Sequence, residues 1–115
     1  MDITVLQNRQ GVNEQELTEL LGRGGILKIQ CIFSPEERAN NLHGAWVLRV
    51  SDDGETWALV VLSTKNEACV FRTASALSRF LLGKGFKVCA LPLRKGESVE
   101  IGKDGQYRYS PISHT

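Results

Sequence analysis

Residues 46–62, WVLRVSDDGETWALVVL, hold two apolar runs joined by a polar turn. Alternation of side chains over residues 46–50 is the pattern of a strand with one buried face. The Asp53-Gly54 pair favours the positive backbone angles of a tight hairpin turn. Residues 57–63 then follow without polar alternation, as in a central strand that is covered on both faces. The sequence therefore predicts two antiparallel strands in the middle of the chain.

A third strand and a helix are expected directly after this hairpin. Residues 64–67 predict a turn and residues 68–71 a short strand, which completes a three-stranded antiparallel meander. Thr73 has the position of an N-cap, and a broad apolar stripe follows over residues 74–81. Gly83 or Gly85 is expected to end this helix. The fold class we predict is α+β, a mainly antiparallel sheet of about five strands with the helix over residues 73–82 packed across one face.

Three further elements are expected before residue 46. Asn13 and Glu16 form a capping-box pattern at the start of a short helix, which a run of glycines ends. Residues 26–33 alternate in the manner of a strand with one buried face. A Ser-Pro-Glu-Glu sequence begins residues 34–41 and has the form of a helix start, which predicts a helix of one or two turns.

The C-terminal part predicts one more strand and a hairpin. Residues 86–93 are apolar enough for a fifth strand, and Pro92 places it at an edge or a strand end. Residues 94–109 predict a small hairpin appended to the domain, and residues 110–115 a mobile tail. We expect a single domain over residues 1–115 with its core in residues 13–93. The predicted core side chains are Leu27, Ile29, Trp46, Leu48, Leu59, Val61, Phe71, Leu77, Phe80 and Leu81.

Length and composition favour a globular protein in the cytoplasm. The chain has 115 residues, 42% of them hydrophobic and 23% charged, which are values typical of one globular domain. Its longest apolar stretches, residues 57–62 and 89–93, are far shorter than the ~20 residues that a membrane-spanning helix needs. Residues 1–10 lack the basic flank and apolar core of a secretion signal. We expect no contact with a membrane.

The reactive side chains predict no enzyme, cofactor or metal site. The three cysteines, at positions 31, 69 and 89, lie in apolar runs and are too widely spaced for a redox or zinc pair. We interpret them as buried small hydrophobic residues. A catalytic thiol, the alternative, needs a histidine or basic neighbour. The two histidines, His43 and His114, fit no triad or zinc pattern.

Basic residues are concentrated in the C-terminal portion. Residues 72–115 contain eight lysines and arginines against three acidic residues. Such an excess is typical of a surface that binds nucleic acid or an acidic partner. The alternative is a solvated surface that pairs with the acidic middle of the chain. The candidate binding residues are Arg72, Arg79, Lys84, Lys87, Arg94 and Lys95.

A family resemblance covers the middle third of the chain. The strand over residues 46–50, the sequence LVVLSTK at residues 59–65, VFRTASAL at residues 70–77 and the later Leu81 and Gly85-Phe86 resemble small plasmid-encoded accessory proteins associated with partition and stable inheritance. The Phe71 to Ala76 pattern is also similar to the small sheet-plus-helix arm-binding domains of phage integrases, which implies DNA binding. The chain departs from those domains in having Lys65 as the only basic residue on its third and fourth predicted strands.

Two functions are therefore open. The first is a non-enzymatic accessory binding protein of a mobile genetic element, which acts in plasmid maintenance or partition through protein–protein contact. An open sheet edge could make it a homodimer. The alternative is a small DNA-binding protein that uses the basic C-terminal portion. Trp46 and Trp57 could then stack on bases, although tryptophans in apolar runs more often fill cores.

Overall fold

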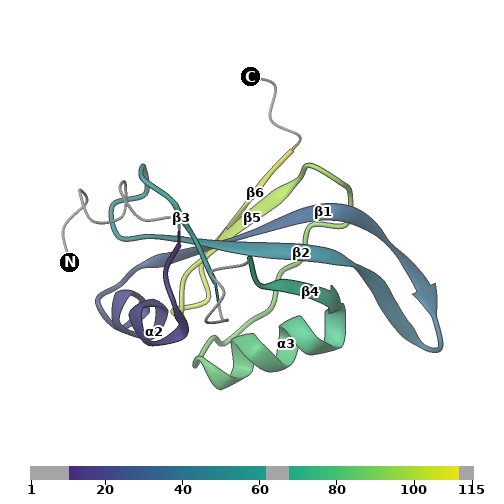
Figure 1. Cartoon of the computed structure of the whole chain (residues 1–115), viewed down its shortest axis with the longest axis horizontal. Coiled ribbons are helices and arrows are strands. Elements are labelled where there is room, and N and C mark those ends of the chain that lie inside the picture. Colours follow the sequence, from purple (N-terminus) through teal and green to yellow (C-terminus); the bar gives the residue numbers. More distant parts are fainter. Residues whose placement is uncertain (1–10, 62–67, 112–115) are drawn as a thin grey trace.

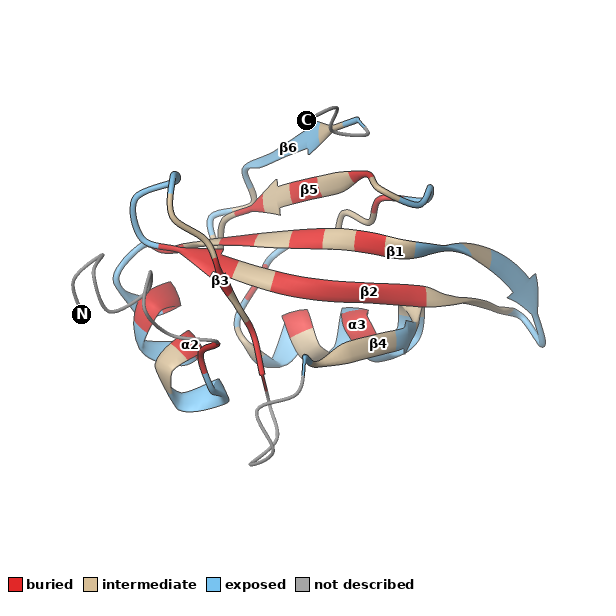
Figure 2. Cartoon of the chain, turned by 45° about the horizontal axis from the view of Figure 1, so that its top comes forward, coloured by how far each residue is buried: buried red, intermediate tan, exposed pale blue. Residues whose placement is uncertain are grey.

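A computed structural model describes residues 11–61 and 68–111, and it confirms the α+β class and the mainly antiparallel sheet. The strands follow one another across the sheet in the order β3-β2-β1-β5-β6, and β4 pairs with β2. Both helices lie below the long strands β1 and β2 in Figures 1 and 2. The elements are α2 (Glu14–Gly22), β1 (Ile26–Arg38), β2 (Asn41–Ser51), β3 (Ala58–Leu59), β4 (Val70–Thr73), α3 (Ala74–Gly83), β5 (Ser98–Ile101) and β6 (Tyr107–Ser110).

Both predicted principal helices are confirmed together with their caps. Asn13 and Glu16 form the reciprocal capping box of α2, with backbone-to-side-chain distances of 2.8 and 3.1 Å. The Thr73 hydroxyl accepts from the N–H of Ala76 at the start of α3. Gly85, with φ +90°, follows the end of α3 in the left-handed conformation that glycine favours. These boundaries could be predicted because caps and apolar stripes are local signals.

The predicted helix over residues 34–41 is wrong. This segment instead continues β1 and turns through Ala39 and Asn40, at φ 53° and 62°, into β2. No apolar stripe follows the Ser-Pro start, so a helix here would have no face to bury. The register with β2 shifts between Cys31 and Phe33 and again between Phe33 and Glu36. The second shift contains Pro35, which lacks the N–H needed for a regular ladder. The product is a two-stranded arm, residues 33–44, which projects from the sheet at the right of Figure 1.

The predicted meander is confirmed only in part. Strand β3 is two residues long and pairs with β2 at Arg49 and Val50, and the chain beyond it meets the next predicted strand only in the antiparallel bridge Val61↔Ala68. Strand β4 pairs with the same edge of β2, farther towards the arm. On its other edge, the segment that follows β3 forms an isolated parallel bridge between Val60 and Val12. Both side chains are buried, which accounts for the apolar sequence there. The predicted turn at residues 64–67 lies outside the described residues.

The predicted fifth strand over residues 86–93 is also wrong. These residues cross from α3 to β5 as irregular chain. They form no strand ladder and are held in place by individual contacts. The side chain of Phe86 is buried, and the carbonyl of Pro92 accepts a hydrogen bond from Trp46 Nε1 at 2.9 Å. The predicted C-terminal hairpin is present as β5 and β6. It extends the main sheet, because β5 pairs with β1 from Leu27↔Ile101 to Gln30↔Ser98.

The core lies between the helices and one face of the sheet (Figure 2). Seven of the predicted core side chains are buried, whereas Leu59, Phe71 and Phe80 are half-buried. Phe71 and Phe80 pack against the core at its margin, with ring centroids 5.1 Å apart. Among the described residues, no helix has the length and apolar character required to cross a membrane.

Candidate functional site

Three of the six predicted basic residues lie near the base of the arm. Arg72 is an exposed residue of β4, which pairs with β2 next to the arm. Arg94 and Lys95 precede β5, and the backbone N–H of Lys95 donates to the Ser34 hydroxyl at 2.9 Å. That bond fixes the loop before β5 against the arm. The structure thus brings residues that are distant in sequence to one end of the molecule.

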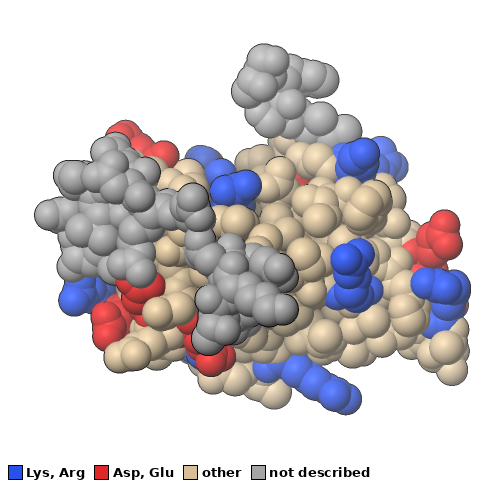
Figure 3. All heavy atoms as spheres, in the orientation of Figure 1, with Lys and Arg blue, Asp and Glu red and all other residues tan. Residues whose placement is uncertain are grey.

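The other three basic residues lie along α3 or just beyond it. Arg79 is exposed on the helix, and Lys87 lines a shallow hollow of about 150 Å³ at the helix end. Lys84 contacts α2: its Nζ lies 3.2 Å from the Glu14 carboxylate and donates to the Thr18 hydroxyl at 3.1 Å. The six residues therefore form two groups. Figure 3 shows lysine and arginine side chains spread over one face of the molecule rather than gathered in one patch.

A hollow of about 280 Å³ lies against the arm, from its base at Phe33 and Gly44 to Arg38 beside the turn, and we call it the arm-base hollow. Arg38 from the end of β1 and Arg72 from β4 line it, together with His43 and Glu36. Within residues 11–61 and 68–111, no ion pair or hydrogen bond is recorded for either arginine side chain. Two arginines against one carboxylate give the hollow an excess of positive charge. Its remaining lining residues are Phe33, Ser34 and Gly44.

A polar row crosses the face of the sheet that the two helices leave uncovered. Arg49, Lys28, Glu100 and Arg108 are successive cross-strand neighbours on β2, β1, β5 and β6. Glu100 and Arg108 form an ion pair at 3.5 Å, and Lys28 Nζ lies 4.2 Å from the centroid of the Trp57 ring. The row is thus largely engaged within the protein. Trp57 already carries a lysine on its ring, which makes it a poor platform for stacking on bases.

Strand β6 forms one end of the sheet. The hydrogen bond from Gly102 N to Gln106 O, at 2.9 Å, sets the alternation of the β5–β6 ladder. Arg108 and Ser110 therefore direct their backbone groups to β5, and Tyr107 and Tyr109 direct theirs outward. No described strand pairs with this outer edge. The two tyrosine side chains are 63% and 51% exposed, so β6 presents both backbone and aromatic groups to solvent.

The hydroxyl of Tyr109 donates to Glu97 Oε2 at 2.7 Å, and this contact raises the pKa of the phenol. Ionisation would break the bond and place two negative charges together. In a Tyr107→Phe background, Tyr109 is the only tyrosine, because the chain has two. We expect Glu97→Ala to lower the pKa of Tyr109 towards the ordinary value of about 10. Absorbance of the tyrosinate during an alkaline titration measures this, with Tyr107→Phe alone as the control. Identical titration curves for the two proteins would contradict the contact.

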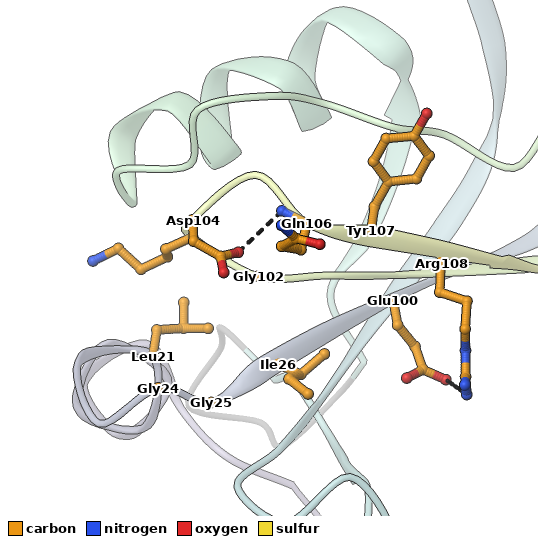
Figure 4. A pocket seen from close by; sticks show the side chains of 11 residues that line it. Leu21, Gly24, Gly25, Ile26, Glu100, Gly102, Asp104, Gln106, Tyr107 and Arg108 are labelled. Atoms are coloured by element: carbon orange, nitrogen blue, oxygen red, sulfur yellow. Dashed lines mark hydrogen bonds and ion pairs between the residues drawn. The ribbon is translucent and has the colours of Figure 1, made fainter.

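A hollow of about 580 Å³ lies between the end of α2 and the β5–β6 hairpin. Leu21 and Ile26 lie on one side of it and the hairpin on the other, whereas the Tyr107 ring points away (Figure 4). Asp104 accepts from the N–H of Gln106 at 3.0 Å. The acidic groups at this hollow are thus paired within the hairpin, and no cluster of reactive groups converges there.

The cysteines differ in their exposure, which corrects the prediction that all three are buried. Cys31 is buried, Cys69 is half-buried and Cys89 is exposed. Burial raises the pKa of Cys31 and of Cys69, so these thiols are protonated at neutral pH. Cys89 Sγ lies 3.6 Å from the Ser78 hydroxyl. In the part of the chain that the structure describes, no group of three or more metal-ligating side chains occurs.

Comparisons of the chain with family models, with curated proteins and with solved structures found no match. The function therefore has to be argued from the surfaces themselves. Sequence reasoning missed Arg38 and the tyrosines of β6. A signal for the arm was present in Asn40, because asparagine tolerates the positive φ of a two-residue turn. The alternation of tyrosine and arginine over residues 107–109 was a signal for an edge strand.

Proposed function

We propose that this chain is a non-enzymatic accessory binding protein that acts through protein–protein contact in the cytoplasm. The observation that supports contact with a protein is the outer edge of β6. There the backbone N–H and C=O groups of Tyr107 and Tyr109 have no strand partner within residues 11–61 and 68–111, and their rings are exposed. A strand edge of this kind binds an extended segment or a second edge by continuing the sheet. The assignment to plasmid maintenance or partition rests on the resemblance of residues 46–86.

A second copy of the chain fits this edge in one antiparallel register. A twofold axis at Arg108 pairs Tyr107 of one protomer with Tyr109 of the other, so all outward backbone groups of β6 are used. The tyrosine rings then form cross-strand pairs on the helix side of the sheet. The two Arg108 side chains face one another on the opposite side. Since β6 has four residues, we expect a weak dimer that dissociates on dilution.

Size-exclusion chromatography with light scattering, over a range of protein concentrations, tests the dimer. Tyr107→Pro removes an outward N–H without removing a β5–β6 hydrogen bond, so we expect it to abolish dimerisation. Tyr107→Phe keeps the N–H and the ring and is the matched control. Added salt should strengthen the dimer by screening the facing arginines. A strict monomer at high concentration, or a dimer that Tyr107→Pro leaves intact, would rule out this edge.

DNA binding is the second candidate function, and the arm-base hollow favours it. A two-stranded β-ribbon has dimensions that the major groove of DNA admits. At the base of this ribbon lie Arg72, Arg94 and Lys95, three of the predicted binding residues. A gel-shift assay at ~50 mM salt tests the candidate, because contacts to phosphates are strongest at low salt. A duplex that is not retarded by micromolar protein would rule it out.

A further inference from the structure

We propose that the arm-base hollow binds a phosphate group of duplex DNA. Arg38 and Arg72 bind the phosphate, and Glu36 opposes the binding. This site rests on the second candidate function, DNA binding. It specifies where the phosphate binds, which side chains favour the binding and which one opposes it. The two arginines come from different strands, β1 and β4, and line the same hollow of about 280 Å³. Guanidinium groups are suited to phosphate because their planar N–H groups match its oxygens in pairs.

The lack of ion pairs at Arg38 and Arg72 among the described residues favours a ligand from outside the protein. Glu36 lines the hollow with them, yet no ion pair between Glu36 and either arginine is recorded among the described residues. By contrast, Lys84 and Arg108 have carboxylate partners at 3.2 and 3.5 Å. The arginines of the hollow are therefore available to a second anion. The Ser34 hydroxyl is already engaged by the loop before β5, so it shapes the hollow instead of serving as its main donor.

The position of the hollow favours a phosphate that belongs to a polymer. Its lining extends along the arm from Phe33 and Gly44 to Arg38 beside the turn, so a duplex that received the arm in its major groove would place a backbone strand beside the hollow. Arg94 and Lys95 flank this end of the molecule and add positive charge along such a strand. A free phosphate ion would have only the two arginines and His43. We therefore expect duplex DNA to bind more tightly than inorganic phosphate.

Fluorescence anisotropy of a labelled duplex, measured over a series of salt concentrations, tests the site. Each phosphate contact contributes ~0.9 to the steepness of the log–log dependence of affinity on salt. We expect Arg38→Ala and Arg72→Ala each to weaken binding several-fold and to reduce the steepness by about one contact. Glu36→Gln should act in the opposite direction and tighten binding. The matched controls are Arg23→Ala and Lys103→Ala, which remove cations at the end of α2 and in the β5–β6 turn and should leave the salt dependence unchanged.

The outcomes separate this site from the function on which it rests. Binding that the double variant Arg38→Ala/Arg72→Ala leaves unchanged would overturn the site and keep DNA binding. Equal losses in the control variants would also overturn it, since they would indicate general charge attraction. No binding at ~50 mM salt would remove both. Circular dichroism of each variant verifies its fold; if Arg38→Ala does not fold, the opposite effect of Glu36→Gln decides.

Inorganic phosphate, added as a competitor, distinguishes the source of the ligand. If the hollow is the phosphate-binding site, inorganic phosphate should displace the duplex from the parent protein more effectively than chloride at equal ionic strength. This difference should vanish in Arg38→Ala/Arg72→Ala. Binding of phosphate with no binding of duplex would overturn the assignment to DNA.

Discussion

Replacing Trp46 with alanine is expected to lower the free energy of unfolding by about 3–5 kcal/mol. The side chain is fully buried in the middle of β2, opposite Cys31 in the ladder with β1. Its removal leaves a large cavity and also takes away the Nε1–H that donates to the carbonyl of Pro92 at 2.9 Å. Small domains have only about 5–15 kcal/mol of stability in total. Urea denaturation should therefore show a much lower midpoint or an unfolded protein.

Two variants separate the contributions of Trp46. Trp46→Phe keeps most of the buried ring but leaves the Pro92 carbonyl without its donor, which costs about 1–3 kcal/mol. Trp57→Ala removes the other tryptophan, which is half-buried and carries Lys28 on its ring, and should cost about 1–2 kcal/mol. Equal losses in Trp46→Ala and Trp57→Ala would show that the two tryptophans do not differ in burial as described.

The hydrogen bond of Trp46 also shows why part of the fold escaped prediction. The apolar sequence of residues 86–93 is equally typical of a strand and of a chain that crosses a core face. Which of the two forms depends on the partner available: β5 pairs with β1 at Leu27 to Gln30, so that edge is occupied. A single long-range contact to Trp46 then holds the crossing. Local periodicity contains no information about such competition for an edge.

The two helices, in contrast, could be predicted with their caps. The signals at Asn13, Glu16 and Thr73 are hydrogen bonds within three residues of one another, so the sequence alone specifies them. The Ser-Pro start at residue 34 has the same local form and failed. The difference is the stripe that follows: Leu17 and Leu77 are buried, whereas the residues after Pro35 are charged or polar and exposed. A cap begins a helix only where packing sustains it.

The candidate site, like the fold, could be predicted from the sequence only in part. The excess of basic residues could be read from composition, and Arg72 is one of them. Arg38, which lines the arm-base hollow together with Arg72, lies in the segment for which the sequence predicts a helix, so its place beside Arg72 was not predicted. Only the pairing of residues 36–38 with 41–43 directs Arg38 and His43 to the hollow that Arg72 also lines. Charge content is thus visible in the sequence, whereas the grouping of charges depends on the register of the arm.

Replacing Gly25 with alanine is the second large effect that we expect, a loss of about 1–3 kcal/mol in the free energy of unfolding. A Cβ atom at this position would lie 2.6 Å from the carbonyl oxygen of Leu20 and 3.2 Å from that of Ser51. The N–H of Gly25 also donates to the Leu20 oxygen at 2.9 Å, which closes the end of α2. Both neighbours are backbone atoms. The clash therefore cannot be relieved by turning a side chain, and α2 or the end of β2 would have to move away from residue 25.

The neighbouring glycines are controls for this prediction, because a Cβ atom at either of them would meet no close neighbour. At Gly22, the last residue of α2, a Cβ would meet nothing within 4 Å, so alanine should be neutral or should stabilise the helix by up to about 1 kcal/mol. Gly24 has equally open surroundings but a φ of +93°, so alanine there is destabilising through backbone conformation alone. Urea denaturation of the three variants measures both causes. A loss at Gly22 as large as that at Gly25 would contradict the close approach of the Gly25 backbone to Leu20 and Ser51, which Gly22 does not share.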